Sequence, residues 1–315
     1  MDRRTLLASG LALGLPCSAR ALESPAIERV PLWPGIPPGG DDSVRDETVL
    51  RSPNGDPDDI AWPHVGTPAM TVARAPKPNG GAMLIIPGGG FARVAIGRKP
   101  GRIAQFFAAR GVTAFELLYR LPHDKWRDGP ATPLQDAQRA MRLIGAGAAK
   151  WRIDPARIAA AGFSAGGHVV GQLGRAAASA YAPVDVADAL PTRPKAIGMF
   201  FPVVTMLPPL AHGQSRRELL GPAPSDSLAR AYSLELDVPA DMPSTLVCHS
   251  ADDKTVPMGN SLAMFAGLQA AKIPSELMIG EKGGHGVPLF GPDGKPHVWM
   301  EQYFAFAARH GMLVA

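Results

Sequence analysis

Residues 157–167 read RIAAAGFSAGG, an apolar run that leads into the pattern GFSAG at 162–166. Small residues on both sides of Ser164 suit a sharp turn from a strand into a helix, because glycine avoids clashes where the chain reverses. In such a turn the serine hydroxyl projects above the sheet at a helix N-terminus, where free N–H groups favour developing negative charge. The stretch therefore predicts a strand over 157–161, a helix over 165–180 and a nucleophilic serine between them. The alternative is a glycine-rich turn without chemistry.

Apolar runs and helical patterns alternate on both sides of this stretch. The expected strands cover residues 67–73, 82–87, 112–118, 157–161, 195–201, 245–249 and 276–279. The expected helices cover residues 98–110, 133–151 and 165–180, with further helical patterns after the last two strands. Parallel strands need crossover connections, which helices usually provide, so the alternation predicts an α/β fold with a mostly parallel central sheet and helices on both faces.

Two segments interrupt this alternation. Residues 22–66 are rich in proline, glycine and aspartate, and they predict an irregular arm across the surface with one edge strand near 43–51. Residues 202–240 contain many prolines and a helix candidate near 214–220. Because the second segment follows a strand end, we expect it to lie above the strand ends as a small proline-rich lid.

Composition indicates a folded protein of enzyme size. The chain has 315 residues, of which 46% are hydrophobic and 19% charged, and this balance argues against disorder. Lysine and arginine number 32 against 28 acidic residues, and no long basic cluster occurs, so nucleic acid is not an expected partner. The 2 cysteines are too few for a disulfide framework or, alone, a zinc site.

The N-terminal segment, residues 1–21, has the pattern of a signal peptide. Arg3 and Arg4 precede an apolar run over 6–15, and the sequence Ala-Arg-Ala at 19–21 supplies a cleavage site. The paired arginines favour the twin-arginine export route. The run is shorter than the roughly 20 apolar residues that span a bilayer. We therefore expect an exported protein, periplasmic or secreted, with no membrane anchor in the mature form. The alternative is an amphipathic N-terminal helix.

A base and an acid that could serve Ser164 follow it in the chain. His285 lies between glycines in the sequence GGHG, just after the last expected strand, and the flexible loop could deliver its imidazole to the serine. Asp252 and Asp253 follow the strand over 245–249. An acid at the carboxyl end of a parallel strand lies on the same rim as Ser164. The alternative role for either aspartate is to cap the next helix.

The other histidines have more ordinary explanations. His168 opens the helix after the serine and is expected to pack or hydrogen-bond beneath it. His249 ends a strand. The remaining ones are expected in loops or on exposed helices: His64, His123, His212, His297 and His310.

A glycine-rich stretch follows the expected strand over 82–87. The sequence PGGGF at 87–91 lets backbone N–H groups approach a tetrahedral intermediate closely. We expect donors for the oxyanion from Gly89, Gly90 and the residue after the nucleophile, Ala165. The alternatives are a tight turn or a phosphate-binding loop, but the patterns of nucleotide-binding loops are missing, as are those of catalytic metal sites. The sequence predicts no cofactor and no metal.

These motifs together resemble the α/β-hydrolase superfamily, and in particular the exported acetyl-xylan-esterase-like and feruloyl-esterase-like carbohydrate esterases. The resemblance covers nearly the whole mature chain. It is carried by LWPG at 32–35, PGGGF at 87–91, LYRL at 118–121, DAQRA at 136–140, GFSAGGH at 162–168, DDKTVP at 252–257 and GGHG at 283–286. Pro87 stands where many lipase-type relatives have a histidine, and the resembling carbohydrate esterases often carry the same PGGG.

The resemblance implies a single α/β-hydrolase domain over 22–315. It implies the catalytic residues Ser164, Asp253 and His285, with Asp253 preferred to Asp252 because it stands three residues before Val-Pro. The implied function is a serine esterase that removes short acyl groups, acetyl above all, from carbohydrate such as xylan or its oligosaccharides.

Other functions stay open at this stage. A general short-chain carboxylesterase or lipase uses the same residues, as does a peptidase of the prolyl-oligopeptidase type, which usually has a further large domain. A hydrolase-fold protein that only binds its ligand is the non-enzymatic alternative. The expected partner is a small-molecule or oligosaccharide ester. We expect Phe163 and Phe91, beside the reacting centre, to keep the acyl pocket small.

Overall fold

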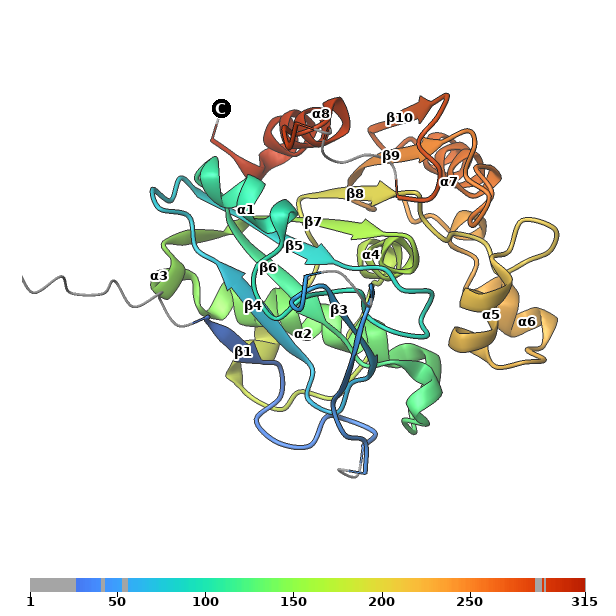
Figure 1. Cartoon of the computed structure of the whole chain (residues 1–315), viewed down its shortest axis with the longest axis horizontal. Helices are drawn as coiled ribbons and strands as arrows, with labels where there is room; N and C mark the ends of the chain where they lie inside the picture. Colours follow the sequence, from blue (N-terminus) through green and yellow to red (C-terminus); the bar gives the residue numbers. More distant parts are fainter. Residues whose placement is uncertain (1–26, 41–42, 53–55, 287–290, 292, 315) are drawn as a thin grey trace, which may run out of the picture.

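The computed structural model describes residues 27–40, 43–52, 56–286, 291 and 293–314; the expected signal peptide lies outside them. Its centre is an eight-stranded sheet, in the order β1-β4-β6-β5-β7-β8-β9-β10 (Figure 1). The strands are β1 (Arg29–Pro31), β4 (Ala69–Ala73), β6 (Thr113–Leu118), β5 (Gly80–Ile86), β7 (Ile153–Phe163), β8 (Ala196–Phe200), β9 (Ser244–Ser250) and β10 (Ser275–Gly280). The pairs from β6 to β10 are parallel, and β4 is antiparallel to both of its neighbours, β1 and β6.

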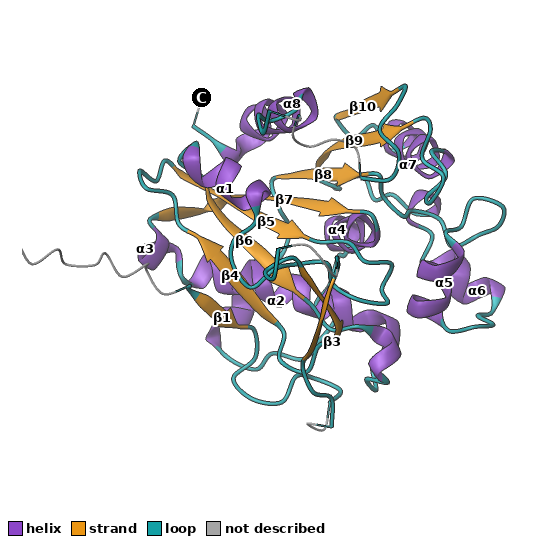
Figure 2. Ribbon diagram, viewed as in Figure 1, coloured by secondary structure: helices purple, strands orange, loops and turns teal. Residues whose placement is uncertain are grey.

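Helices cover both faces of this sheet (Figure 2). They are α1 (Arg102–Ala109), α2 (Thr132–Ala146), α3 (Ala148–Trp151), α4 (Ala165–Arg175), α5 (Gly213–Leu220), α6 (Asp226–Ala231), α7 (Gly259–Ala270) and α8 (Val298–Ala307). One apolar cluster joins the sheet to α2, α4 and α7, and a second joins its other face to α1 and α8. The prediction of a mostly parallel sheet between two helical layers is confirmed, and the fold is the α/β-hydrolase fold.

Several predicted boundaries differ from the observed ones. The helix expected over 133–151 is divided into α2 and α3 at Gly147, and the helix expected over 165–180 ends at Arg175. The edge strand expected near 43–51 is β2 (Glu47–Leu50), which pairs with β3 (Ile60–His64) in a separate two-stranded sheet. The edge strand next to β4 in the main sheet is instead the short β1, whose three residues offer no alternation to detect.

The segment over 202–240 carries α5 and α6 and connects β8 to β9. It lies beside the carboxyl ends of the parallel strands (Figure 1). An ideal Cβ on Gly90, in the loop after β5, would stand 3.3 Å from Oε1 of Gln214 on α5, so the segment contacts the rim of the sheet. Its role as a lid stays a prediction.

Close backbone contacts hold α4 against the centre of the sheet. An ideal Cβ on Gly162 would lie 2.1 Å from the carbonyl oxygen of Gly166, and one on Gly166 would lie 2.1 Å from that of Ile86. Real Cβ atoms do not approach so closely, so a side chain at Gly162 would push α4 away from β7, and one at Gly166 would push it away from β5. The two glycines around Ser164 therefore allow the helix N-terminus to reach the sheet.

Buried ion pairs tie the N-terminal arm to the core. Asp136 of α2 accepts hydrogen bonds from Trp33 Nε1 at 2.8 Å and from the guanidinium of Arg120 at 2.9–3.0 Å. The same guanidinium donates to Oε1 of Gln135 at 2.9 Å. Arg139, one turn along α2, donates to the carbonyl oxygen of Leu32 at 2.8 Å. The polar residues of the 118–121 and 136–140 motifs thus fix the arm.

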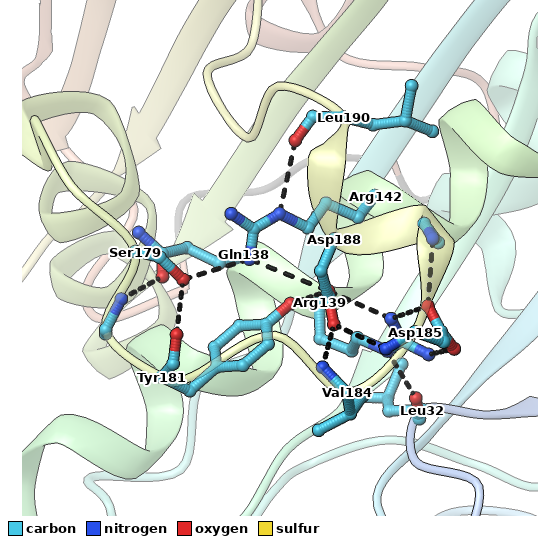
Figure 3. A network of polar contacts seen from close by, with 12 residues as sticks. Leu32, Gln138, Arg139, Arg142, Ser179, Tyr181, Val184, Asp185, Asp188 and Leu190 are labelled. Carbon is cyan, nitrogen blue, oxygen red and sulfur yellow. Dashed lines mark hydrogen bonds and ion pairs between the residues drawn. The ribbon is translucent and has the colours of Figure 1, made fainter.

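Figure 3 shows how Arg139 continues this network beyond the arm. Its guanidinium donates to Asp188 at 2.9 Å and to Asp185 at 2.5 Å and 2.8 Å. The hydroxyl of Tyr181 donates to the same Asp188 at 2.5 Å. The two carboxylates offset the charge of the buried arginine, which would be costly to bury alone.

No helix of the described residues has the length and apolar content needed to cross a membrane.

Candidate active site

Ser164 occupies the turn between β7 and α4. Its backbone has φ of 54° and ψ of −118°, a conformation that residues other than glycine rarely adopt. Its N–H donates to the carbonyl oxygen of Phe200 at 3.0 Å, and its own carbonyl accepts from Gly167 at 2.9 Å and Val203 at 3.0 Å. These bonds hold the serine in the strained turn that the sequence predicts.

The structure brings three predicted residues together. His285 Nε2 lies 2.9 Å from Ser164 Oγ, and His285 Nδ1 lies 2.8 Å from Asp253 Oδ2. An ionised carboxylate only accepts, so Nδ1 carries the proton and Nε2 is free to accept the serine hydroxyl. The side chain of Asp253 is fully buried, whereas that of His285 is 25% exposed, so the chain of bonds runs from the interior to an accessible imidazole.

Asp253 is held as a carboxylate by its neighbours. Burial alone would raise its pKa, but the hydrogen bond from His285 and the backbone N–H groups of Thr255 and Val256 outweigh it and lower the pKa below its usual value. The two backbone donors contact Oδ1 at 2.8 Å and 3.0 Å, which leaves Oδ2 for the imidazole.

Asp252, the alternative acid, has a different place. Its Oδ1 accepts the N–H of Gly284 at 2.8 Å, so it holds the loop that carries His285 and does not contact the imidazole nitrogen. Neither aspartate caps the next helix, since α7 begins at Gly259 with Met258 as its N-cap.

The predicted oxyanion donors lie beside the serine. An ideal Cβ on Gly88 would stand 2.9 Å from Ser164 Cβ, so the glycine loop packs directly against the turn. Gly89 and Gly90 have φ of 137° and 68°, which glycine adopts without strain. Within the described part of the chain, the N–H groups of Gly89, Gly90 and Ala165 have no acceptor. The three donors are thus free for a ligand.

Comparison with known proteins places the chain in a family. Residues 72–268 match the BD-FAE family, which is more than half of the chain. This chain belongs to the BD-FAE family. The matched segment contains Ser164 and Asp253, and His285 follows it.

Two curated relatives of this BD-FAE family member have longer chains. It is 33% identical over 213 residues, 66% of its length, to endo-1,4-beta-xylanase B of Butyrivibrio fibrisolvens. It is 27% identical over 215 residues, 67% of its length, to acetylxylan esterase of Xylanibacter ruminicola. The matches span 32% and 42% of those two proteins, so the chain corresponds to only part of each.

A solved structure resembles the BD-FAE chain over nearly its whole length. The acetyl ester-xyloside bifunctional hydrolase from Caldicellulosiruptor lactoaceticus is 27% identical, with a TM-score of 0.71, over 91% of this chain and 97% of that one. A truncated carbohydrate esterase from gut microbiota is 20% identical, with a TM-score of 0.65, over 81% of this chain and 98% of its own, and shares the fold.

A second histidine contacts the acid in this BD-FAE site, which the sequence reasoning missed. The buried His249 lies with Nε2 3.2 Å from Asp253 Oδ2 and 3.0 Å from the carbonyl oxygen of Val256, while Nδ1 lies 2.6 Å from Ser261 Oγ. Burial lowers the pKa of His249, so the ring is neutral, and its Nε2–H is shared between the carbonyl oxygen of Val256 and the carboxylate of Asp253. The available signal was the position of His249 one residue before the carboxyl end of β9, the strand that leads to Asp253.

The aromatic rings around the BD-FAE site differ in part from expectation. Phe163 stacks on Phe200 at 4.8 Å between ring centroids, and Phe91 packs edge-on against His168 at 5.8 Å; all are buried. The ring that contacts His285 is Phe201, 4.9 Å away. The small acyl pocket stays a prediction, and Phe201 joins the residues that could bound it.

Proposed function

We propose that this chain is a serine hydrolase of carboxylic esters, and that it removes short acyl groups, acetyl above all, from carbohydrate such as xylan or its oligosaccharides. The observation that carries the proposal is the chain of hydrogen bonds from buried Asp253 through His285 to Ser164 at the N-terminus of α4. The relatives support the substrate class, because their names include an acetylxylan esterase and an acetyl ester-xyloside hydrolase.

The first half of the reaction forms an acyl-enzyme. Nε2 of His285 takes the proton of Ser164 Oγ as that oxygen attacks the ester carbonyl. Asp253 keeps the imidazole in the tautomer with Nδ1–H and stabilises the imidazolium that forms. The imidazolium then gives its proton to the oxygen of the departing sugar alcohol, and the C–O bond breaks.

The negative charge that forms on the carbonyl oxygen meets preorganised donors. Gly89 and Gly90 offer N–H groups from the loop after β5, and Ala165 offers one at the N-terminus of α4. Within the described residues none of these three groups has another acceptor. One such donor is worth roughly 3 kcal/mol of transition-state stabilisation. In the second half, water deprotonated by His285 attacks the acyl-enzyme, and the acid leaves as Ser164 regains its proton.

Two measurements test this proposal. Ser164→Ala removes only the attacking oxygen, so the purified variant should keep its melting temperature and lose up to about 10⁶-fold in kcat. Retention of more than a few per cent of wild-type turnover would contradict the nucleophile assignment. It would also indicate either that another group is the nucleophile or that the chain is a hydrolase-fold protein that only binds its ligand.

The acyl and alcohol preferences need a separate series. We expect kcat/KM to fall from acetyl to butyryl to octanoyl esters, with acetate released from acetylated xylan. Each methylene in a pocket changes the transition-state free energy by only about 1–3 kcal/mol, so the trend should be graded. If kcat/KM rose from acetyl to octanoyl esters and no acetate were released from the polysaccharide, the chain would be a general carboxylesterase of free esters. Cleavage of amides would indicate a peptidase.

A further inference from the structure

Two histidines and an aspartate from distant parts of the chain meet beside the glycine loop. His64 ends β3, whereas His123 and Asp124 lie in the 3-10 turn Pro122–Asp124 after β6. One possible ligand atom from each lies within 4.8 Å of the other two. None of the three residues takes part in the hydrogen bonds that join Asp253, His285 and Ser164, and the proposed reaction does not use them.

His123 has too few protons for its neighbours. Its Nδ1 lies 3.1 Å from the carbonyl oxygen of Phe91, and its Nε2 lies 3.0 Å from that of Pro63. Carbonyl oxygens only accept, and a neutral imidazole carries a single N–H. With Nδ1–H donating to Phe91, the Nε2 lone pair faces an oxygen lone pair unless a second proton or a cation stands between them.

One carboxylate lies within the cluster, and two more lie on its outer side. Nε2 of His123 is also 3.5 Å from Asp124 Oδ1, which lies 2.5 Å from His64 Nδ1. On the outer side, Glu47 lies 3.8 Å from His64 Nε2, and Glu218 of α5 lies 4.0 Å from His123 Nδ1. The negative charge of the acidic residues favours a divalent cation at the centre of the cluster.

We propose that His64 Nδ1, His123 Nε2 and Asp124 Oδ1 bind a zinc ion. Two imidazoles and one carboxylate form a ligand set that Zn²⁺ prefers, and the carbonyl oxygen of Pro63 or a water can take the fourth position. A histidine that binds a metal usually donates its other N–H to a carbonyl or carboxylate. The carbonyl oxygen of Phe91 stands in that position for His123, and the carboxylate of Glu47 stands on that side of His64.

The distances require a small adjustment. Ligands about 2.1 Å from a tetrahedral zinc stand about 3.4 Å from one another, which the His123–Asp124 pair at 3.5 Å already satisfies. The His64–Asp124 pair at 2.5 Å must open by about 1 Å, where zinc replaces the proton of their hydrogen bond. His64 has 45% of its side chain exposed and can move, while buried Asp124 stays fixed by the N–H of Val65.

The ion would join three parts of the molecule: the β2–β3 pair, the turn after β6, and, through His123, the loop that begins with Gly88. It would replace an unfavourable contact by ligand bonds, so the expected consequence is a more stable protein. The proposal does not depend on the proposed function, because its readouts are binding and stability and not turnover.

Zinc binding to the full mature chain tests the proposal. The protein, prepared without a polyhistidine tag and stripped with EDTA, is titrated with ZnCl₂ in a calorimeter. We expect one zinc per chain and a melting temperature that rises with zinc. His64→Ala and Asp124→Asn should each weaken binding by more than about 100-fold, whereas His310→Gln, on the turn after α8, should bind like the wild type.

Location decides between this site and others. Anomalous scattering at the zinc edge should place the ion between His64, His123 and Asp124, and Co²⁺ in the same place should give a tetrahedral absorption spectrum. A peak on His285, or equal affinity in the wild type and His64→Ala, overturns the proposal. So does an NMR spectrum in which both ring nitrogens of His123 stay protonated at saturating zinc, since an imidazolium would then hold the two carbonyl groups. If His64→Ala fails to fold, the anomalous map of the wild type still decides.

Discussion

The strained turn at Ser164 links one residue to the proposed chemistry. A positive φ of 54° at a non-glycine residue costs about 1–3 kcal/mol, and it persists only where the surroundings determine it. Here three backbone hydrogen bonds, to Phe200, Gly167 and Val203, fix the serine from both sides. The strain places Oγ within 2.9 Å of His285 before a substrate arrives.

At Asp253 and Asp252 we predict unequal effects of the same substitution. Asp253→Asn should lower kcat by about 10⁴-fold, because an amide favours the wrong imidazole tautomer and does not stabilise the imidazolium. Asp252→Asn should cost less than about tenfold, since its amide oxygen can still accept the N–H of Gly284. Esterase kinetics on both purified variants measure this, and the opposite ranking would assign the acid role to Asp252.

His249 should act as a positioning residue for Asp253. His249→Phe removes a donor to a charged group, a bond worth about 1.5–3 kcal/mol, so we expect kcat to fall by about 10- to 100-fold with little change in KM. Without that donor the charge of Asp253 acts more strongly on His285, so the acidic limb of the pH–rate profile should move to higher pH. His249→Gln, which keeps an N–H donor, should restore part of kcat; an unmoved limb would leave His249 with packing alone.

At the scale of elements, β6 places the carboxyl group of Glu116 in the apolar layer under α1. Glu116 is 6% exposed, and its carboxyl accepts the N–H of Gly101 at 2.9 Å. Burial raises its pKa to about 7, and this single hydrogen bond does not offset the effect. The strand therefore carries a carboxyl that keeps its proton in the folded chain at pH values where the unfolded chain loses it.

This raised pKa gives a pH-dependent prediction. Between pH 4.5 and about 7 the folded protein binds more protons at Glu116 than the unfolded chain does, so its contribution to stability falls as the pH rises. The Glu116→Gln variant has no carboxyl to titrate, so its free energy of unfolding does not fall in this way. Relative to the wild type, that free energy should rise by up to about 3 kcal/mol between the two ends of the window. Urea unfolding at pH 4.5, 6 and 7.5 measures the difference; a gap that is constant with pH would contradict it.

At the scale of the whole molecule, buried charge joins the N-terminal arm to the hydrolase core. In the arm, Trp33 donates a hydrogen bond to Asp136. The carbonyl oxygen of Leu32 accepts one from Arg139, and that of Pro38 accepts one from Arg120. These contacts connect segments about a hundred residues apart, and truncation of one partner in a buried pair leaves an uncompensated charge. In the described residues the arm is therefore part of the same folded unit as the central sheet.

We propose that residues 1–21, outside the described residues, direct export of the folded chain to the periplasm or beyond. Replacing Arg3 and Arg4 by lysine should leave an unprocessed precursor in the cytoplasm, because the twin-arginine route reads that pair. Cell fractionation and N-terminal sequencing measure this, with Leu22 expected as the first residue of the exported protein. Normal processing of the double variant would indicate the general secretory route.

Local patterns were enough to predict the central fold and the residues of the candidate site. Buried parallel strands such as β5 appear as short apolar runs because both of their faces are covered, and the turn at Ser164 needs small residues at set positions. The short motifs around Ser164, Asp252 and Asp253, and His285 could be recognised for the same reason, whereas the choice of Asp253 came from the resemblance to the α/β-hydrolase superfamily. These features depend on residues that are close in sequence.

Other features depend on which distant segments meet, and only the tertiary structure decided them. The short β1 and the partner of β2 were not predictable, because strand pairing is set by contacts across the sheet. His249 becomes a donor to Asp253, and His64 meets His123 and Asp124, only after β9 and the turn after β6 take their places. The sequence determines the type of each side chain. Its hydrogen-bond partners, its burial and the resulting pKa shift are decided by the tertiary structure, because each depends on which other residues the fold places around the group.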